Sequence, residues 1–198
     1  MSPGADESAA GRPVDRSVDR PVDRSATVRV VEYDPKWPRL FAEEAAVLRG
    51  VFGSEPVAIE HIGSTAVPGL PAKPIIDIMA GVSGWDVFDL VVERLAAVGY
   101  RYTPEAEKDD PSRKVFRKGP SDLSHLRTHH LHVTELDGFY WQRMLAFRDR
   151  LRSHPEEAAA YVALKRELAS RFANESRRYT AGKAEFVIEI ERRAGVRR

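Results

Sequence analysis

The stretch that decides the fold runs from Ile62 to Val82, "IGSTAVPGLPAKPIIDIMAGV". Its glycines and prolines predict a loop, and the apolar run over residues 74–82 predicts a buried central strand. Inside that strand lies one carboxylate, Asp77, with Met79 two positions further along on the same strand face. Because an isolated buried charge is costly, we expect Asp77 to be hydrogen-bonded, paired with a cation or bound to a metal ion, with Lys73 or an incoming Mg²⁺ ion as candidate partners.

Composition limits the class of protein. The 198 residues suit one domain, and a content of 42% hydrophobic and 31% charged residues is typical of a soluble globular protein. The net charge of +1 gives no general case for binding nucleic acid or a membrane, and no stretch predicts a membrane span or a signal peptide. The absence of cysteine excludes disulfides, thiolate catalysis and cysteine-ligated zinc. We therefore expect a cytoplasmic protein.

Patterning divides the chain into three parts. Residues 1–26 repeat Val-Asp-Arg and offer almost nothing to bury, so they predict a disordered tail. Residues 27–136 alternate strand and helix patterns, which predicts an α/β (α+β) core with a mixed sheet and flanking helices. Residues 137–198 have a helical pattern throughout and predict a C-terminal helical region packed on that core.

The expected elements follow from periodicity and capping signals. Strand patterns lie at 27–33, 56–62, 74–82, 114–118 and 129–135, and helical patterns at 37–52 and 85–98. Residues 101–111 predict a charged loop. Farther on, a capping box at 153–156 and a cap at Thr180 predict the starts of the second and third C-terminal helices.

The glycine-rich loop does not match the common nucleotide-binding motifs. Five residues separate Gly63 from Gly69, and Pro74 follows Lys73, so the Walker pattern fails. No helix follows the glycines, which excludes a dinucleotide fingerprint. A Gly63-Ser64 turn at the end of a strand can still present backbone amides and a hydroxyl to an anionic group.

Histidines are concentrated on the last expected strand. Side-chain alternation places His130 and His132 on one face and His129 on the other. Two imidazoles with Asp77 suit a mononuclear Zn²⁺ or Mn²⁺ site, a proton-transferring pair or an anion contact. A polar strand face that is hydrogen-bonded to loops remains the structural alternative.

Arginines flank the same expected cleft. Alternation along "RKVFRK" puts Arg113 and Arg117 on one face, and Arg127 follows nearby in the chain. Guanidinium groups engage phosphate bidentately, so these residues suit a triphosphate or another polyanion. Solvated charges on an edge strand are the alternative. Four residues near the start of the last helix are further candidate ligand contacts: Asn174, Arg177, Arg178 and Lys183.

Several stretches together resemble the GrpB family, from about residue 30 to residue 190: "VEYDPKWPRLFAEEAAVLRGVFG", "IEHIGSTAVPGLPAKPIIDIMAGV", "RTHHLHV", "YVALKRELASRF" and "YTAGKAEFV". The block His61–Leu70 followed by Ala72–Asp77 is the most specific part. That family is itself similar to the nucleotidyltransferase superfamily. The resemblance therefore implies a nucleotidyltransferase-like mixed sheet.

The superfamily resemblance also implies a site. Gly63-Ser64 matches the phosphate-binding turn, and Asp77 matches the first of the carboxylates that hold two Mg²⁺ ions. Met79 stands at the second position and cannot bind Mg²⁺, a departure that argues against two-metal catalysis. His130 and His132 lie on the strand that should supply the third carboxylate. The implied cofactor is Mg²⁺ or Mn²⁺ with a nucleoside triphosphate.

The implied roles are as follows: Asp77, His130 and His132 are catalytic, Asp77 and His132 are metal ligands, and Gly63, Ser64, Thr65, Lys73, Arg117 and Arg127 bind phosphate. The leading hypothesis is a divergent nucleotidyltransferase that binds a nucleotide or similar phosphorylated molecule and transfers a nucleotidyl group to an unidentified acceptor. The alternative is a non-catalytic nucleotide- or coenzyme-binding accessory module, since GrpB-like domains also occur fused behind dephospho-coenzyme A kinase. A His/Asp metal hydrolase is the third. No protein partner is indicated.

Overall fold

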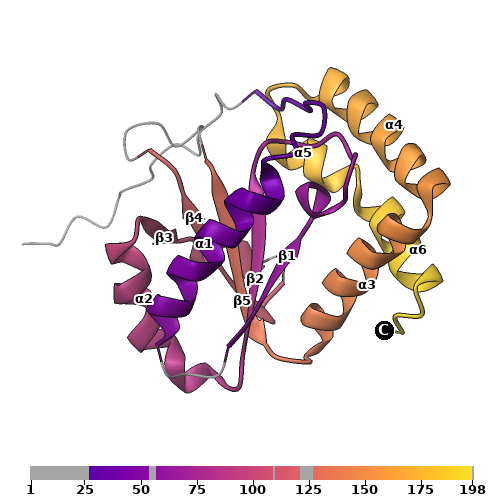
Figure 1. Cartoon of the computed structure of the whole chain (residues 1–198). Coiled ribbons are helices and arrows are strands. Elements are labelled where there is room, and N and C mark those ends of the chain that lie inside the picture. The colour runs from indigo at the N-terminus through magenta and orange to yellow at the C-terminus, as the bar shows by residue number, and fades with distance from the viewer. Residues whose placement is uncertain (1–26, 54–56, 109, 121–126, 198) are drawn as a thin grey trace, which may run out of the picture.

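The centre of the molecule is a five-stranded mixed sheet with the strand order β1–β2–β5–β4–β3 (Figure 1). The computed structural model describes residues 27–53, 57–108, 110–120 and 127–197, so the tail predicted at 1–26 lies outside the described residues. The strands are β1 (Val57–Ile62), β2 (Ile76–Val82), β3 (Tyr100–Tyr102), β4 (Arg113–Lys118) and β5 (His129–Glu135). β2 and β5 are parallel, and the other pairs are antiparallel. The predicted mixed sheet with flanking helices is confirmed.

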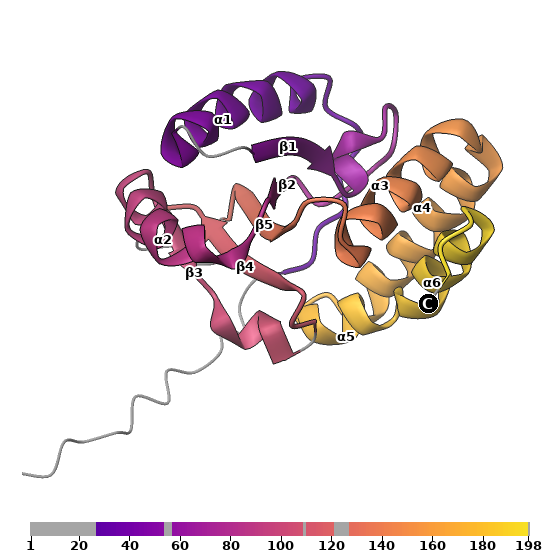
Figure 2. The same ribbon diagram turned by 90° about the horizontal axis from the view of Figure 1, so that it is seen from below.

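Helices cover both sides of the sheet, in two groups that are far apart in sequence (Figure 2). One side carries α1 (Trp37–Phe52) and α2 (Phe88–Ala97), and the other carries α3 (Phe139–Ser153), α4 (Pro155–Arg171), α5 (Ser176–Ala181) and α6 (Ala184–Arg193). Three short 3₁₀ helices, η1 (Ser64–Ala66), η2 (Trp85–Val87) and η3 (Pro104–Lys108), lie in the connections. No helix in these ranges is long and apolar enough to cross a membrane.

The main core lies between the sheet and the first helix group. Ile76 and Ile78 of β2 are at most 2% exposed and pack with Leu48 of α1 and Leu95 of α2. On the opposite face of β2, an added Cβ on Gly81 would lie 2.8 Å from the Trp141 ring. The small residue therefore lets α3 approach the sheet closely. Alternation along one strand thus fixes both packing surfaces.

The strand expected at 27–33 does not form, and this prediction was wrong. Val31 makes a single isolated bridge to Ala72, and the Val28 amide donates to the Ala173 carbonyl at 2.6 Å. Val28 packs against Tyr179 rather than against the sheet. The segment therefore joins the glycine-rich loop to the C-terminal helices, while Val31 and Tyr33 pack against the main core.

The charged loop expected at 101–111 is partly regular. Its start pairs with β4 as β3, and residues 104–108 form η3. Tyr100 is 1% exposed, and Tyr102 packs on Phe88 and Phe116. Aromatic packing in the tertiary structure gives this short strand a stability that its charged sequence does not predict.

The C-terminal region is helical as expected, but two predicted caps are wrong. The Ser153 hydroxyl donates to the Asp149 carbonyl at 2.9 Å, and no side chain caps α4. Thr180 lies inside α5, and α6 begins after Lys183. Both predicted capping residues instead belong to the preceding helix, because α3 ends at Ser153 and α5 includes Thr180. The division into a core and a C-terminal region at residue 137 stays a prediction.

Candidate functional site

Strand register places four polar residues in one row across the sheet. Arg101 of β3 pairs with Arg117 of β4, which pairs with His130 of β5, which pairs with Asp77 of β2. Directly paired residues share a sheet face, so all four lie on the side that carries the C-terminal helices. The sequence predicted Asp77 and His130 as site residues, and the structure brings them together.

The direct partner of Asp77 is His130. The two side chains are 30% and 23% exposed, and His130 Nδ1 lies 3.1 Å from Asp77 Oδ1. Burial by itself would raise the pKa of Asp77. The hydrogen bond from His130 and the electrostatic influence of His130, His132 and Lys183 outweigh burial, so the pKa of Asp77 lies below its ordinary value. Asp77 is therefore an ionised acceptor at neutral pH. Lys73, a cationic partner expected from the sequence, interacts electrostatically with Asp77, and no hydrogen bond or ion pair joins these two side chains in the described ranges.

This pairing leaves one nitrogen of His130 available. When Nδ1 carries the proton and donates to Asp77, Nε2 is the acceptor nitrogen. His130 Nε2 is buried and has no hydrogen-bond partner in the part of the chain that the structure describes. The geometry is that of a histidine oriented by a carboxylate, with its second nitrogen able to take a proton.

Gly63 brings the glycine-rich loop against Asp77. Its φ is +71°, and a Cβ at this position would lie 2.5 Å from Asp77 Oδ2. Any side chain would both strain the turn and displace the carboxylate. The loop that the sequence predicted to bind phosphate therefore adjoins the predicted carboxylate.

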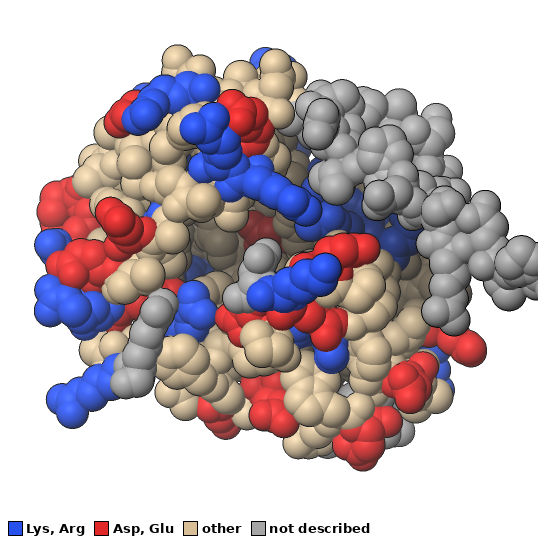
Figure 3. All heavy atoms as spheres, turned by 180° about the vertical axis from the view of Figure 1, so that it is seen from behind, with Lys and Arg blue, Asp and Glu red and all other residues tan. Residues whose placement is uncertain are grey.

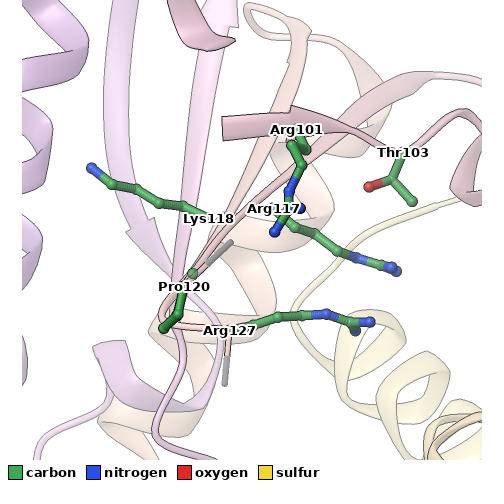
Figure 4. A pocket seen from close by; sticks show the side chains of 7 residues that line it. Arg101, Thr103, Arg117, Lys118, Pro120 and Arg127 are labelled. Atoms are coloured by element: carbon green, nitrogen blue, oxygen red, sulfur yellow. The ribbon is translucent and has the colours of Figure 1, made fainter. Parts of the chain in front are cut away.

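Four half-buried cations surround this pair, and we call them the basic cluster: Lys73, Arg117, Arg127 and Lys183. Lys73 and Lys183 lie close enough to interact electrostatically with Asp77. The positive charges of Arg117 and Arg127 also lower the pKa of Lys73. Lys and Arg side chains gather beside a hollow on this side of the molecule (Figure 3). Arg117 and Arg127 point the same way, toward the C-terminal helices, whereas Lys118 points to the opposite side (Figure 4).

Burial is the main influence on the basic cluster. Burial first, and neighbouring positive charges second, lower the pKa of Lys73, that of Lys183 to about 8 and that of Arg117 to about 10. Among the described residues, no hydrogen bond or ion pair reaches these four side chains. The cluster therefore has positive charge without matching protein acceptors.

Of the four candidate contacts near the last helix, Lys183 alone belongs to this cluster. Asn174 accepts a hydrogen bond from Thr27, and Arg178 pairs with Glu175.

His132 has a different environment from His130. Its Nδ1 lies 2.8 Å from an Arg113 guanidinium nitrogen and 3.1 Å from the Tyr140 hydroxyl. Burial and the Arg113 charge lower the pKa of His132 to about 3, so this ring is neutral at physiological pH. Within the described ranges no three His, Asp or Glu side chains gather closely enough to hold a metal ion. The Asp77 and His132 metal pair stays a prediction.

Thr65 and Ser64 face different surroundings although they adjoin in the chain. Thr65 is 1% exposed, and its hydroxyl lies 3.0 Å from His61 Nε2 and donates to the Ile75 carbonyl, so it supports the loop from the core side. Ser64 is half-buried, and its hydroxyl accepts a hydrogen bond from Lys165 Nζ at 3.1 Å.

The C-terminal helices hold the glycine-rich loop in place, which sequence reasoning missed. Lys165 of α4 also donates to the Pro71 carbonyl, and burial lowers its pKa to about 7. From α3, Arg152 donates twice to the Ala66 carbonyl, at 2.8 and 3.1 Å, and Arg148 donates to the His61 carbonyl at 3.0 Å. Nothing in the sequence distinguishes these cations from ordinary charges on a helix surface.

Comparison with known proteins places the chain in a family. Residues 27–193 match the family described as GrpB protein, and the chain belongs to the GrpB family. The crystal structure of the conserved protein GrpB from Enterococcus faecalis is 38% identical, with a TM-score of 0.75, and the match covers 84% of this chain and 96% of that one. The resemblance predicted from the sequence is confirmed.

The chain spans about half the length of some curated relatives. UPF0157 protein YqkA of Bacillus subtilis is 39% identical over 84% of this chain and 47% of its own length. A dephospho-CoA kinase of Mycolicibacterium paratuberculosis is 33% identical over 85% of this chain and 46% of its own. A distant likeness to a solved structure of the Cid1 poly(U) polymerase has 10% identity and a TM-score of 0.43 over 69% of this chain and 45% of that one, which is too weak to bear on function.

Proposed function

We propose that this protein binds a nucleotide, or a similar phosphate-bearing small molecule, beside the Asp77–His130 pair. The observation that carries the proposal is the basic cluster, whose half-buried charges have no protein acceptors within the described residues. Like charges held together and partly desolvated are unfavourable until an anion joins them. Phosphate oxygens would provide that anion, with Lys73 and Lys183 nearest to Asp77.

The loop would hold the same phosphates by different means. The Gly63-Ser64 turn would present its amides and the Ser64 hydroxyl, while Lys165 keeps that hydroxyl oriented. The close contact between Gly63 and Asp77 would fix the distance between the phosphates and the carboxylate.

Transfer of a nucleotidyl group is the reaction that this arrangement supports. His130 Nε2 would take the proton from an acceptor hydroxyl, whose oxygen bonds to the α-phosphorus while the bond to the leaving pyrophosphate breaks. Asp77 would orient His130 and stabilise its protonated form.

A divalent ion fits this site only as a companion of the triphosphate. Asp77 Oδ1 is engaged by His130 and Oδ2 faces Gly63, while Met79 is fully buried among apolar side chains. A single protein carboxylate is enough for a Mg²⁺ or Mn²⁺ ion that enters bound to the nucleotide, because phosphate and water oxygens would supply the other ligands of the ion. Such an ion would neutralise the developing phosphate charge. His132 would join it only by giving up its two Nδ1 contacts.

Thermal denaturation with a nucleotide panel tests the proposal. ATP or GTP with Mg²⁺ or Mn²⁺ should raise the Tm, because a ligand that binds only the native state stabilises it. Asp77→Asn should remove the metal-dependent part of the shift and leave the ligand-free Tm nearly unchanged. Asp110→Asn is a matched control, since Asp110 is a half-buried carboxylate paired with Arg143 elsewhere. If no nucleotide changes the Tm, with or without metal, the proposal is wrong.

The relation to dephospho-CoA kinase supports a second candidate, a non-catalytic module that binds nucleotide or coenzyme. Coenzyme A and dephospho-coenzyme A in the same panel test it. A Tm shift with these ligands, without turnover of any nucleoside triphosphate, favours the accessory role over transfer.

A further inference from the structure

The ring of His132 carries a hydrogen-bond donor that the proposed reaction does not use. Both hydrogen bonds of this ring are at Nδ1, from an Arg113 guanidinium nitrogen at 2.8 Å and from the Tyr140 hydroxyl at 3.1 Å. A guanidinium group only donates, so Nδ1 is the acceptor nitrogen and the ring proton is on Nε2. We infer that Arg113 and Tyr140 are positioning residues that fix His132 in this tautomer. His132 Nε2–H then donates to the acceptor hydroxyl that the proposed reaction brings to His130, so the inference rests on the proposed function.

Arg113 and Tyr140 are themselves held in place. The Arg113 guanidinium donates to the Tyr140 hydroxyl at 2.9 Å and lies over the Tyr140 ring, 5.0 Å from its centroid. Tyr140 is 4% exposed, and its ring stacks on His132 with the centroids 5.9 Å apart. Arg143 lies over the same ring and pairs with the buried Glu191. The hydroxyl that meets Nδ1 therefore has little freedom, and rotation of the His132 ring would lose two hydrogen bonds.

Strand register sets the direction of the second nitrogen of His132. Arg113 is the register partner of Thr134, the next residue after His132 on the same face of β5. His130, the residue before it on that face, is the register partner of Asp77. The two nitrogens of an imidazole point in widely different directions, so contacts to Nδ1 on the Thr134 side leave Nε2 toward the Asp77 side. His132 interacts electrostatically with both Asp77 and His130, and the described residues provide no acceptor for its Nε2.

His130 and His132 together present one acceptor and one donor. His130 Nε2 accepts a hydrogen bond when its Nδ1 donates to Asp77, and His132 Nε2 donates one. Residues two apart on one strand face lie about 7 Å apart, and one oxygen that bonds to two nitrogens spans roughly 5 Å. A hydroxyl group would therefore bridge the two rings, since it both donates and accepts. An ammonium group would face the His132 donor with a donor of its own, and a carboxylate would face the His130 lone pair.

The two histidines have different roles in the proposed transfer. The hydroxyl proton passes to His130 Nε2, the oxygen bonds to the α-phosphorus, and the bond to the leaving pyrophosphate breaks. His132 keeps its proton throughout and holds the oxygen through one lone pair, which leaves another for phosphorus. The same tautomer has no lone pair at Nε2 for a metal ion, and the lone pair at Nδ1 is in use. On this inference His132 donates to the acceptor and does not ligate a metal.

Nitrogen-15 NMR of the full chain reads the histidine tautomers directly. Couplings between ring nitrogens and carbon-bound ring protons distinguish a protonated nitrogen from one with a free lone pair. At neutral pH the His132 proton should be on Nε2, and a proton on Nδ1, alone or in addition, would overturn the inference. This measurement on the wild-type chain needs no variant.

Substitution of Arg113 tests what fixes the tautomer. Arg113→Met should let the His132 proton exchange between the two nitrogens, and Arg113→Lys, which keeps a donor, should restore the wild-type signal. Arg39→Met is the control, because Arg39 is an exposed residue of α1 on the other side of the sheet. Tyr140→Phe removes one of the two donors and should give a smaller change than Arg113→Met. If neither variant differs from Arg39→Met, the two residues do not position His132 and the inference is wrong.

Glycerol is the probe for the hydroxyl, and methylammonium chloride at the same concentration is the mismatched probe. Glycerol should move the Nε2 signals of His130 and His132 together, while His154, at the junction of α3 and α4, serves as the internal control. Methylammonium should leave the His132 signal unchanged. His132→Gln, whose amide reaches the Nε2 position, should keep glycerol binding near the wild-type level. His132→Asn, whose amide reaches only the Nδ1 position, should weaken glycerol binding roughly tenfold.

The outcomes separate the inference from the proposed function. If glycerol moves neither Nε2 signal, or only one of them, the inference is wrong even where nucleotides raise the Tm. If His132→Gln and His132→Asn weaken glycerol binding equally, no donor at Nε2 is involved and the inference is also wrong. If the tautomers and the glycerol response are as expected but no nucleotide changes the Tm, the histidine pair binds a hydroxyl and the proposed function fails.

Discussion

The two faces of the central sheet differ in how they treat charge. On the face toward α1 and α2, the buried carboxylate of Glu44 receives two hydrogen bonds from Lys118, at 2.8 and 2.9 Å. On the face toward the C-terminal helices, the basic cluster has no acceptor within the described ranges, and His130 Nε2 has no partner. Both faces are built by the same strands, so burial alone does not explain the difference.

This contrast distinguishes a core from a candidate site. A buried polar group in a native protein normally finds its partner, and the Glu44–Lys118 pair follows that rule. Groups that break the rule together, at one end of neighbouring strands, indicate that a ligand completes them. The contrast makes distinct predictions for the two faces, and each can be tested separately.

The largest expected effect is on the core face. Ile78 is fully buried, so Ile78→Ala should lower the free energy of unfolding by about 2–5 kcal/mol. Asp77→Asn, at the adjacent position on the other face, should cost less than about 1.5 kcal/mol, because the amide oxygen can still accept from His130. Urea denaturation measures both. An Asp77→Asn variant as unstable as Ile78→Ala would mean that Asp77 is a structural residue.

Acid should destabilise the protein through one histidine on each face. Burial lowers the pKa of His61 to about 4 and that of His132 to about 3, against an ordinary value of 6.5. Below pH 6.5 these histidines bind protons in the unfolded chain but stay neutral in the folded chain. The free energy of unfolding therefore falls as the pH drops toward the folded-state pKa values. For His61 the loss by pH 4 is about 3 kcal/mol.

Denaturation as a function of pH measures this loss, and His61→Gln or His132→Gln should each reduce its slope. The contribution of His61 to the slope ends near pH 4, and that of His132 ends near pH 3. The reduced slope of His132→Gln should therefore extend to a lower pH than that of His61→Gln. An unchanged slope in both variants would show that neither ring is held neutral by the fold.

The smallest expected change in stability comes from alanine substitution at two glycines, and comparing them separates the cost of a steric contact from the cost of backbone strain. Gly63→Ala and Gly69→Ala both place a side chain at positive φ, +71° and +77°, which costs about 1–2 kcal/mol. Gly69 has open space around it, whereas the new Cβ at Gly63 would displace Asp77. Gly63→Ala should therefore be less stable than Gly69→Ala and should also lose the nucleotide-dependent rise in Tm. Equal behaviour of the two variants would show that the loop does not position Asp77.

The sequence predicted those parts of the fold whose pattern is local. The apolar run at 74–82 and the alternating run at 129–135 became β2 and β5, and their pairing brought Asp77 to His130. The segment 27–33 has a strand pattern as well, yet it makes a single isolated bridge to Ala72 and packs partly on the C-terminal helices and partly on the main core. Local alternation indicates that one face of a segment is buried, but it does not identify the element that packs on that face.

Contacts that span the chain were beyond sequence reasoning. Lys165 meets Ser64 across 101 positions, and the pattern of α4 contains nothing that marks this lysine. Alternation alone makes His130 and His132 equivalent. In the structure Arg113 and Tyr140 contact the His132 ring, whereas His130 pairs with Asp77. Neighbours from other strands and helices therefore decide which of two similar histidines keeps a buried, unpartnered ring nitrogen within the described residues.

The hydrogen bonds from α3 and α4 to the glycine-rich loop have a consequence for how members of the GrpB family can differ from one another. Arg148, Arg152 and Lys165 donate to backbone carbonyls of residues 61, 66 and 71, so they act mainly on the course of the main chain, and Lys165 also donates to the Ser64 hydroxyl. If the loop binds the proposed phosphate-bearing ligand, substitutions in these helices would change ligand preference while every residue that touches the ligand stays the same. A chimaera that exchanged only the helical half between two relatives would carry part of the donor's selectivity with it.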